Sequence, residues 1–418
     1  MADLLLRHEL PASFYVPVRN REGPPVMQAA QLRRLAQDFE IGSHTRDHQY
    51  LTQVTPALAR RQISDGKAAL GPMLREYLIS EAMAALGIPT TRALAVVTTG
   101  ETILRDQGPL PAAVLARVAA SHIRVGTFQF FAARGETDKL RALMDYTIAR
   151  HYPDLTGAEN PALALFDAVI ARQARLIAQW MGVGFIHGVM NTDNMALSGE
   201  TIDYGPCAFM EAYDPATVFS SIDRQGRYAY ANQPLILGWN LARLAEALLP
   251  LFDSNEDRAV DLANARLEAI APAYHAAWVD VMRAKLALKG AETGDAALAE
   301  AFLAAIQGQD WTQAFRRLAG LVETGDAGQS EAMQAWLPKW RTRLRPDAAQ
   351  ALQAANPVVI PRNHLVEAAL SAATGGDMAP FDALLTAIRD PFGPATGREG
   401  FSLPAPQGFG AYVTYCGT

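Results

Sequence analysis

The chain has 418 residues, of which 50% are hydrophobic and 19% are charged, and its formal net charge is −6. This length exceeds one ordinary core, so we expect two or three domains. An acidic balance gives no support to a nucleic-acid partner, because a phosphate backbone is met by a basic excess. No apolar run of bilayer length and no secretory leader pattern is evident, so we expect no membrane partner. With only Cys207 and Cys416, the composition predicts a reducing, cytoplasmic location.

The first segment alternates between strand-like and helix-like patterns. Ser13–Val18 and Phe39–Ile41 are short β-branched or aromatic runs, while Met27–Phe39 and Pro56–Ile63 carry apolar residues at helical spacing. This alternation is typical of an α/β fragment.

A different pattern begins after Asp65. Apolar residues at helical spacing predict a helix that ends at Gly87, followed by two strands, Ala93–Thr99 and Ala113–Ala119. From Lys139 onward we expect mostly helix, with long apolar stretches at Asn160–Trp180, Leu235–Leu251 and Arg258–Leu286. Gly and Pro mark a loose tail near the C-terminus, at Pro391–Gly408. A small mixed lobe before a large helical lobe is the outline of a protein kinase, which other α+β proteins share.

One polar stretch stands out, at residues 186–215, with the sequence IHGVMNTDNMALSGETIDYGPCAFMEAYDP. Asn194 and Asp203 offer hard oxygen ligands for Mg²⁺ from two neighbouring loops, and Asp193 offers a base for a hydroxyl proton. Protein kinases use H-R-D-x-x-x-x-N followed by D-F-G, so D-N followed by D-Y-G is related to that pattern and not identical to it. Asn, Thr and Asp also cluster in turns for conformational reasons alone, and spacing leaves both interpretations open.

Several long strings in this part of the chain resemble one family. They are HGVMNTDN, TIDYGP and AYDP in the stretch above, together with GPMLREYLISEAMAALGIPTTRALAVVTTGE, VLARVAASHIRVGTFQ and NPVVIPRNHLVEAAL. Residues 65–418 resemble the selenoprotein O family, pseudokinases that transfer AMP from ATP to protein hydroxyls. The resemblance implies a kinase-like two-lobed fold, ATP and Mg²⁺ as cofactors with Mn²⁺ as an alternative ion, and protein substrates.

The resemblance also implies roles for the residues of the polar stretch. Asp193 would be the catalytic base, and Asn194 and Asp203 would bind the metal. Cys416 lies at the position where some members carry selenocysteine, so a redox role, with or without pairing to Cys207, stands beside that of an inert exposed thiol.

Three residues of the smaller lobe would bind the nucleotide. Glu76 would pair with a phosphate-binding lysine, and Arg117 and Arg124 would hold the phosphates of an ATP bound in reversed orientation. Two guanidinium groups around a strand and turn suit bidentate phosphate binding. The alternative for both arginines is a pair of solvated charges at a strand edge.

The region before Asp65 departs from this family. It contains no glycine-rich loop and no strand lysine, and Lys67 lies too close to Glu76 to return from a preceding strand. Instead, residues 4–51 resemble polysaccharide deacetylases of the NodB type, in which the histidines of H-x-x-x-H bind a metal; here they would be His44 and His48. Without the family's upstream Asp pair, we expect a vestigial site that holds no metal.

We therefore expect an α+β chain: a short α/β fragment followed by a kinase-like two-lobed fold with a truncated small lobe and a large helical lobe. The expected divisions are a deacetylase-like fragment at 1–64, a small-lobe remnant at 65–135, a helical lobe at 136–390 and a tail at 391–418. The predicted function is protein adenylylation on Ser, Thr or Tyr, impaired by the missing loop and lysine. The alternatives are an inactive chimera or other non-catalytic protein, and a metal-dependent carbohydrate deacetylase fragment.

Overall fold

The structure is a computed structural model that describes residues 13–15, 40–42, 68–105, 108–322, 329–409 and 412–415. In the first segment, strand β1 (Ser13–Tyr15) pairs in parallel with β2 (Glu40–Gly42). These strands fall within or beside the two predicted apolar runs. The helices predicted at Met27–Phe39 and Pro56–Ile63 lie outside the described residues.

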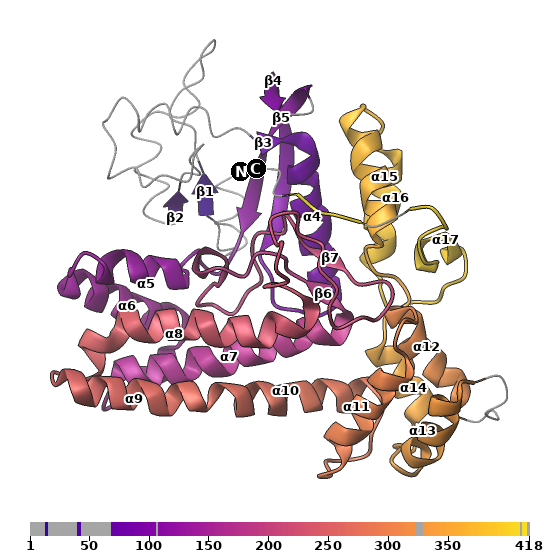
Figure 1. Ribbon diagram of the computed structural model, residues 1–418. Helices are drawn as coiled ribbons and strands as arrows, with labels where there is room; N and C mark the ends of the chain where they lie inside the picture. The colour runs from indigo at the N-terminus through magenta and orange to yellow at the C-terminus, as the bar shows by residue number, and fades with distance from the viewer. Residues whose placement is uncertain are drawn as a thin grey trace.

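A three-stranded antiparallel sheet and one helix form the next unit (Figure 1). Strand β3 (Ala68–Ala69) leads directly into helix α4 (Leu70–Ala85), and the chain returns as a hairpin of β4 (Arg92–Arg105) and β5 (Gly108–Val118). The strand order is β3-β5-β4. Helix α4 buries its apolar face against both strands of the hairpin, and Gly87, with φ of 76°, ends its last turn as predicted.

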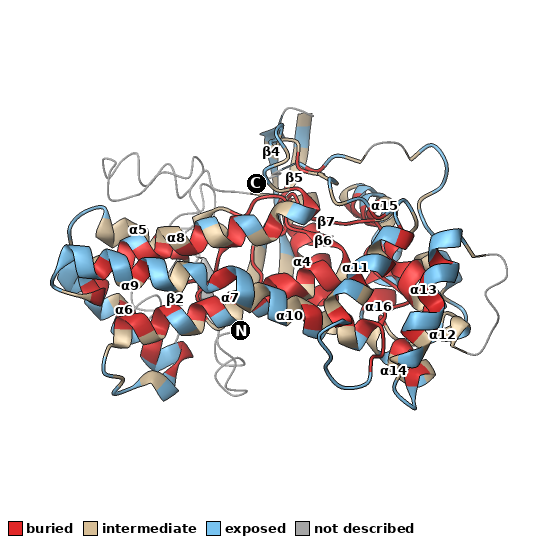
Figure 2. Ribbon diagram, turned by 60° about the horizontal axis from the view of Figure 1, so that its bottom comes forward, coloured by how far each residue is buried: buried red, intermediate tan, exposed pale blue. Residues whose placement is uncertain are grey.

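The larger part of the chain is helical. Its longer helices are α5 (Val125–Ala132), α6 (Thr137–His151), α7 (Pro161–Val183), α8 (Gln233–Phe252), α9 (Glu256–Glu268), α10 (Ile270–Lys285), α11 (Asp295–Ala305), α12 (Trp311–Leu321), α13 (Glu331–Thr342), α14 (Ala348–Ala355), α15 (Asn363–Thr374) and α16 (Ala379–Ile388). Figure 2 shows buried and exposed residues alternating along α8, α9 and α10, as expected for amphipathic helices. The α+β class is confirmed.

Helix α7 is fixed at both ends by local sequence. Asn160 caps its first turn by accepting a hydrogen bond from the backbone N–H of Leu163 at 3.1 Å, and Pro161 occupies the first helical position. Gly184, with φ of 70°, ends the helix and turns the chain toward the polar stretch. The α7 ends therefore determine where that stretch begins.

The helical part agrees with one expectation in more detail and departs from another. The apolar stretch expected over Arg258–Leu286 is helical and is divided into two helices, α9 and α10, because Pro272 cannot continue a helix from the preceding turn. Among the described residues, the helix Tyr230–Phe252 is long and apolar enough to cross a membrane by length and composition, although no such run was expected. Half of its most apolar part is buried within the protein, and core helices of folded domains have the same length and composition.

Two basic side chains of the helical part are buried among the described residues. Lys285 is 5% exposed, donates to Asn356 Oδ1 at 2.8 Å and places its ammonium 4.0 Å from the centre of the Phe315 ring. Arg362 is fully buried and donates to Asp310 Oδ2 at 2.6 Å and Glu211 Oε2 at 3.2 Å. Lys285 thus has one hydrogen-bond acceptor and an aromatic ring as partners, and Arg362 has two carboxylates, while its Nε has no hydrogen-bond partner among the described residues.

The C-terminal segment expected to be loose is bonded to the rest of the protein at several points. It contains a short helix, α17 (Glu399–Ser402), whose Ser402 carbonyl accepts from Arg362 at 3.0 Å. Further along, the backbone N–H of Ala405 donates to Glu211 Oε2 at 3.1 Å, and Thr414 pairs with Ser220 as an isolated parallel bridge. The described part of this segment is thus ordered by contacts distant in sequence.

Candidate active site

A short hairpin brings the two predicted loops together. Strand β6 (Phe185–Ile186) pairs antiparallel with β7 (Ala208–Phe209), so the chain between them leaves and returns at one place. His187 is fully buried directly after β6 and lies 2.8 Å, through Nε2, from the carbonyl oxygen of Ile202. Burial lowers the pKa of His187, which favours a neutral imidazole that connects the two loops through its hydrogen bond.

Asp203 has an unusual backbone conformation, with φ of 63°. Non-glycine residues in the left-handed region are uncommon, and such conformations persist where surrounding contacts hold them. The next residue supplies such contacts: the Tyr204 N–H donates to Glu76 Oε1 at 2.7 Å, and the buried Tyr204 hydroxyl bonds to the Thr90 hydroxyl. Helix α4 therefore touches the Asp203 loop directly.

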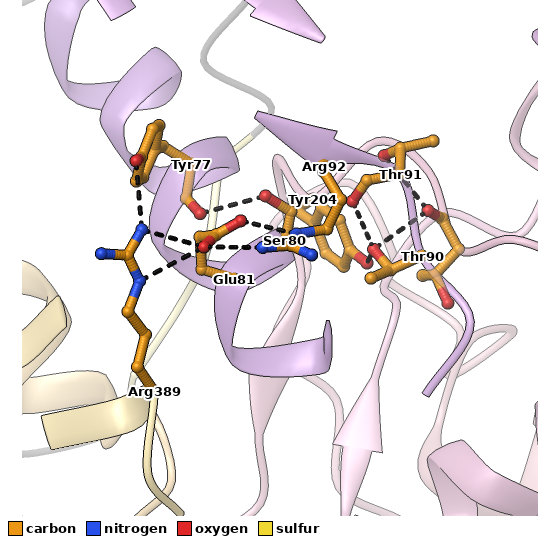
Figure 3. A network of polar contacts seen from close by, with 9 residues as sticks. Tyr77, Ser80, Glu81, Thr90, Thr91, Arg92, Tyr204 and Arg389 are labelled. Carbon is orange, nitrogen blue, oxygen red and sulfur yellow. Dashed lines mark hydrogen bonds and ion pairs between the residues drawn. The ribbon is translucent and has the colours of Figure 1, made fainter. Parts of the chain in front are cut away.

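The opposite part of α4 is anchored as well (Figure 3). Glu81 accepts from Arg92 at the start of β4 at 2.6 Å and from Arg389 just after α16 at 2.9 Å. Burial alone would raise the pKa of Glu81, but hydrogen bonds from the two arginines outweigh it and lower that pKa. These contacts fix the helix that carries Glu76.

Four charged side chains form a chain across the site. Arg117, at the end of β5, donates to Glu76 Oε2 at 2.9 Å and lies 3.0 Å from Asp203 Oδ1. Arg124, just before α5, lies 3.6 Å from Asp203 Oδ2. The side chains of Glu76 and Arg117 are 6% and 14% exposed, so the solvated strand-edge alternative does not describe Arg117. Glu76 thus has an arginine as an ion-pair partner, where the family resemblance implied a lysine.

This arrangement separates the acidities of the two carboxyl groups. Burial raises the pKa of Glu76, and the Arg117 guanidinium opposes that rise. Burial alone would also raise the pKa of Asp203, but the guanidinium groups of Arg117 and Arg124 outweigh it and lower that pKa. Asp203 is therefore the stronger acid of the two.

Asp193 and Asn194 lie in a short 3-10 helix, Thr192–Asn194. The exposed Asp193 meets the first turn of α5, where a Cβ added to Gly126 would lie 2.2 Å from Asp193 Oδ1. Only a glycine fits this position without a shift. Asn194 donates through Nδ2 to the Val189 carbonyl at 2.8 Å, which leaves its Oδ1 facing away from that bond.

The Arg124 segment connects this helix to Asp203. The Arg124 backbone pairs with Ala196 as an isolated antiparallel bridge, and the Val125 N–H donates to the Met195 carbonyl at 3.0 Å. Because the same residue reaches Asp203 through its side chain, the loop of Asp193 and Asn194 and the loop of Asp203 meet at Arg124.

Three predicted residues, His44, His48 and Cys416, lie outside the described residues. Cys207 is a buried free thiol whose Sγ donates to the Tyr204 carbonyl at 3.1 Å, and burial raises its pKa to about 12. Within the described ranges, no group of three or more His, Cys, Asp or Glu side chains is placed to hold a metal.

The sequence interpretation missed contributors that the structure reveals. Gly126, His187 and Arg75 each contact one of the two loops. In the sequence, Arg75 was marked only by its position beside Glu76. Gly126 was marked in the same way, by its position two residues after Arg124.

The chain matches the sequence profile of an enzyme family described as protein adenylyltransferase SelO, over residues 59–389. This match covers most of the chain, which therefore belongs to that family of nucleotidyltransferases. The selenoprotein O resemblance is confirmed.

Relatives from several bacteria agree with this assignment. Proteins named protein nucleotidyltransferase YdiU from Cereibacter sphaeroides are 62% identical over 363 residues, covering 85% of this chain and 76% of the relative. The protein of the same name from Rhizobium leguminosarum is 56% identical over 373 residues, covering 85% and 74%. That from Mycolicibacterium paratuberculosis is 55% identical over 368 residues, covering 85% and 74%.

The front of the chain matches a second family. Residues 1–77 match the profile described as polysaccharide deacetylase. The two matches overlap over residues 59–77, which include the string ISDGKAAL. The resemblance of the first segment to this family is confirmed.

Proposed function

We propose that this chain carries the site of a protein adenylyltransferase, which moves AMP from ATP to Ser, Thr or Tyr hydroxyl groups of proteins. The observation that carries the proposal is the chain of charges from Glu76 through Arg117 and Asp203 to Arg124, with Asp193 against Gly126, two residues after Arg124. Membership in the family and the name shared by the relatives support it.

We also propose that the fold is a kinase-like pair of lobes, divided at about residues 64, 135 and 390 as the sequence predicts. Protein kinases pair a lysine on a strand of the small lobe with a glutamate on the helix that follows that strand. Here α4 carries Glu76 between β3 and the β4–β5 hairpin, and the loops of Asp193 and Asp203 come from the helical part. This order supports the assignment of residues 65–135 as the remnant of a small lobe.

The residues present fit a divalent cation and a nucleotide triphosphate. Asp203 is held anionic, and Asn194 has an amide oxygen left over after its bond to Val189. Arg124 has a buried Nε without a hydrogen-bond partner among the described residues, so its guanidinium has donor capacity for phosphate oxygens. Asn194 and Asp203 would hold Mg²⁺ or Mn²⁺, which supplies charge neutralisation at the phosphates when bound.

The proposed reaction forms one bond and breaks one. The acceptor hydroxyl oxygen attacks the α-phosphorus of ATP, and the bond from that phosphorus to pyrophosphate breaks. Asp193 accepts the hydroxyl proton, and its exposed position beside α5 leaves room for a protein side chain. Arg117 and Arg124 would bind the remaining phosphates of a nucleotide in reversed orientation, which presents the α-phosphate to the acceptor.

Nucleotide binding requires a rearrangement of charge at Asp203. Both arginines now contact the carboxylate of Asp203, and phosphate oxygens would take over part of their donors. Arg117 would keep its ion pair with Glu76 when the nucleotide binds. Glu76 would thereby orient the Arg117 guanidinium, as the helix glutamate of a protein kinase orients the strand lysine.

We further propose that transfer by this chain is impaired. Among residues 1–64 the sequence has no glycine-rich loop and no lysine. Loss of one charged phosphate contact costs about 2–4 kcal/mol of transition-state stabilisation, or roughly 30- to 1000-fold in rate. An inactive chimera is the second candidate, favoured by the deacetylase match of the first 77 residues.

Transfer of radiolabel distinguishes these candidates. The full chain is incubated with Mn²⁺ and a generic acceptor protein, with ATP labelled at the α-phosphate in one arm and at the γ-phosphate in the other. We expect weak labelling from α-labelled ATP alone, abolished by Asp203→Ala and enhanced when a family-type segment replaces residues 1–64. Labelling from γ-labelled ATP, or none after that replacement, would reject adenylyl transfer.

A further inference from the structure

Arg75 precedes Glu76 on α4 and is 6% exposed. Its Nη2 donates to the carbonyl oxygen of Cys207, four residues after Asp203. Its Nη1 lies 3.1 Å from Glu367 Oε1 on α15 and donates to the Tyr412 hydroxyl at 3.2 Å. The Tyr412 hydroxyl in turn donates to Glu367 Oε1 at 2.6 Å. One buried guanidinium therefore joins α4, the Asp203 loop, α15 and residues 412–415 near the C-terminus.

The C-terminal segment, residues 412–415, also contacts the loop without Arg75. The buried Thr414 donates through Oγ1 to the Pro206 carbonyl at 2.6 Å. Its backbone N–H donates to the Phe219 carbonyl at 2.8 Å, and its carbonyl accepts from the Ser221 N–H at 2.9 Å. The segment thus lies as an added strand along residues 219–221, with one side chain directed at the loop.

These contacts hold the loop at three backbone groups within residues 204–207. Glu76 holds the N–H of Tyr204, Arg75 holds the carbonyl of Cys207, and Thr414 holds the carbonyl of Pro206. The loop begins with the left-handed backbone of Asp203, a conformation that needs surrounding contacts to persist. Two of the three anchors depend on the C-terminal segment, directly or through Tyr412.

We propose that Arg75 is a positioning residue that couples the C-terminal segment 412–415 to the Asp203 loop, so that this segment sets the affinity of the site for a divalent cation. Arg75 and Tyr412 touch neither ATP nor metal in this proposal and act through the backbone of residues 203–207. The effect on cation affinity rests on the proposed function; the effect on loop order does not.

The test for loop order is hydrogen–deuterium exchange on the full chain. Tyr412→Phe removes a single hydroxyl from the anchor, and Tyr415→Phe is the matched control because Tyr415 is 67% exposed. Arg75→Lys keeps the charge and loses the planar fork that spans two partners. We expect Tyr412→Phe and Arg75→Lys to speed exchange over residues 203–210 by about three- to tenfold, the ratio given by one lost hydrogen bond. Helix α10 should be unchanged, as should every segment in Tyr415→Phe.

The second arm measures binding of Mn²⁺ in the presence of ATP by electron paramagnetic resonance. We expect the Kd for Mn²⁺ to weaken by a similar factor in Tyr412→Phe and to stay unchanged in Tyr415→Phe, with Asp203→Ala as the control that abolishes site binding. Unchanged exchange in the loop, or equal acceleration throughout the protein, would overturn the positioning role. If the unmodified chain binds no Mn²⁺, the proposed metal site and the effect on affinity both fail, while the exchange arm still decides whether Arg75 and Tyr412 order the loop.

Discussion

The ion pair of Glu76 and Arg117 predicts a measurable coupling energy. Its atoms are 2.9 Å apart and its side chains are 6% and 14% exposed, so removal of one partner strands a charge in a poorly solvated place. Such losses cost about 3–5 kcal/mol. Glu76→Gln should lower the unfolding free energy by about 2–3 kcal/mol, at or below the lower end of this range. Gln can still accept a hydrogen bond from the Tyr204 N–H, and Arg117 retains Asp203 at 3.0 Å. Arg117→Gln should lower the unfolding free energy by the full amount of about 3–5 kcal/mol.

The double variant should cost less than the sum of the single variants, because neither member of the pair is then left stranded. We expect a coupling energy of about 2–3 kcal/mol from urea unfolding followed by tryptophan fluorescence. The exposed pair of Lys139 and Glu136, with side chains 63% and 32% exposed, is the control and should couple by less than about 0.5 kcal/mol. Additive costs at Glu76 and Arg117 would refute the claim that this pair organises the site.

The same cycle has a pH signature. Burial raises the pKa of Glu76, and Arg117→Gln removes the cation that opposes this rise. The folded state then holds a proton that the unfolded state has lost, so stability falls as pH rises from about 4.3, the usual Glu pKa, through the folded pKa. The cost of Arg117→Gln should therefore be smaller at pH 5 than at pH 8. An equal cost at the two pH values would contradict the assigned burial of Glu76.

Three further predictions concern other parts of the chain. Burial lowers the pKa of Lys285 to about 7, so the unfolded state binds a proton that the folded state lacks, and stability should rise from pH 7 toward 10 by up to about 1.4 kcal/mol per pH unit. Lys285→Met should abolish this rise in urea midpoints, and parallel curves would contradict it. Arg362→Met leaves the partly buried carboxylates of Asp310 and Glu211 without their fully buried cation and should lower the unfolding free energy by about 3 kcal/mol; a cost under about 1 kcal/mol would show that the pairing contributes little. Metal analysis of protein purified without chelator should find no stoichiometric metal at His44 and His48, and one zinc per chain lost in His48→Ala would show an intact site.

Local sequence signals accompany those parts of the fold that local chemistry decides. The end of α4 at Gly87 was predicted, because a left-handed residue follows the last turn. The cap at Asn160 and the left-handed Gly184 at the two ends of α7 are signals of the same kind that the prediction of an apolar stretch at Asn160–Trp180 did not use. Pro272 carried a signal too: it separates α9 from α10, although the apolar pattern runs through both.

The missing parts of the prediction are contacts between residues far apart in sequence. Glu76 and Arg117 are 41 residues apart in the sequence, and Arg75 and Tyr412 are 337 residues apart. No periodicity or cap encodes such pairs, since they depend on how the β4–β5 hairpin and the C-terminal segment pack on α4. The family resemblance supplied residue types for the site, and the structure supplied their partners.

The most direct test of the central claim is a crystal structure of the full chain with Mn²⁺ and a non-hydrolysable ATP analogue. We predict phosphates on Arg117 and Arg124, the metal between Asn194 and Asp203 at about 2.1–2.2 Å from an oxygen of each, and the α-phosphate nearest Asp193. A nucleotide with its γ-phosphate nearest Asp193, or one bound away from Asp203 altogether, would contradict this prediction.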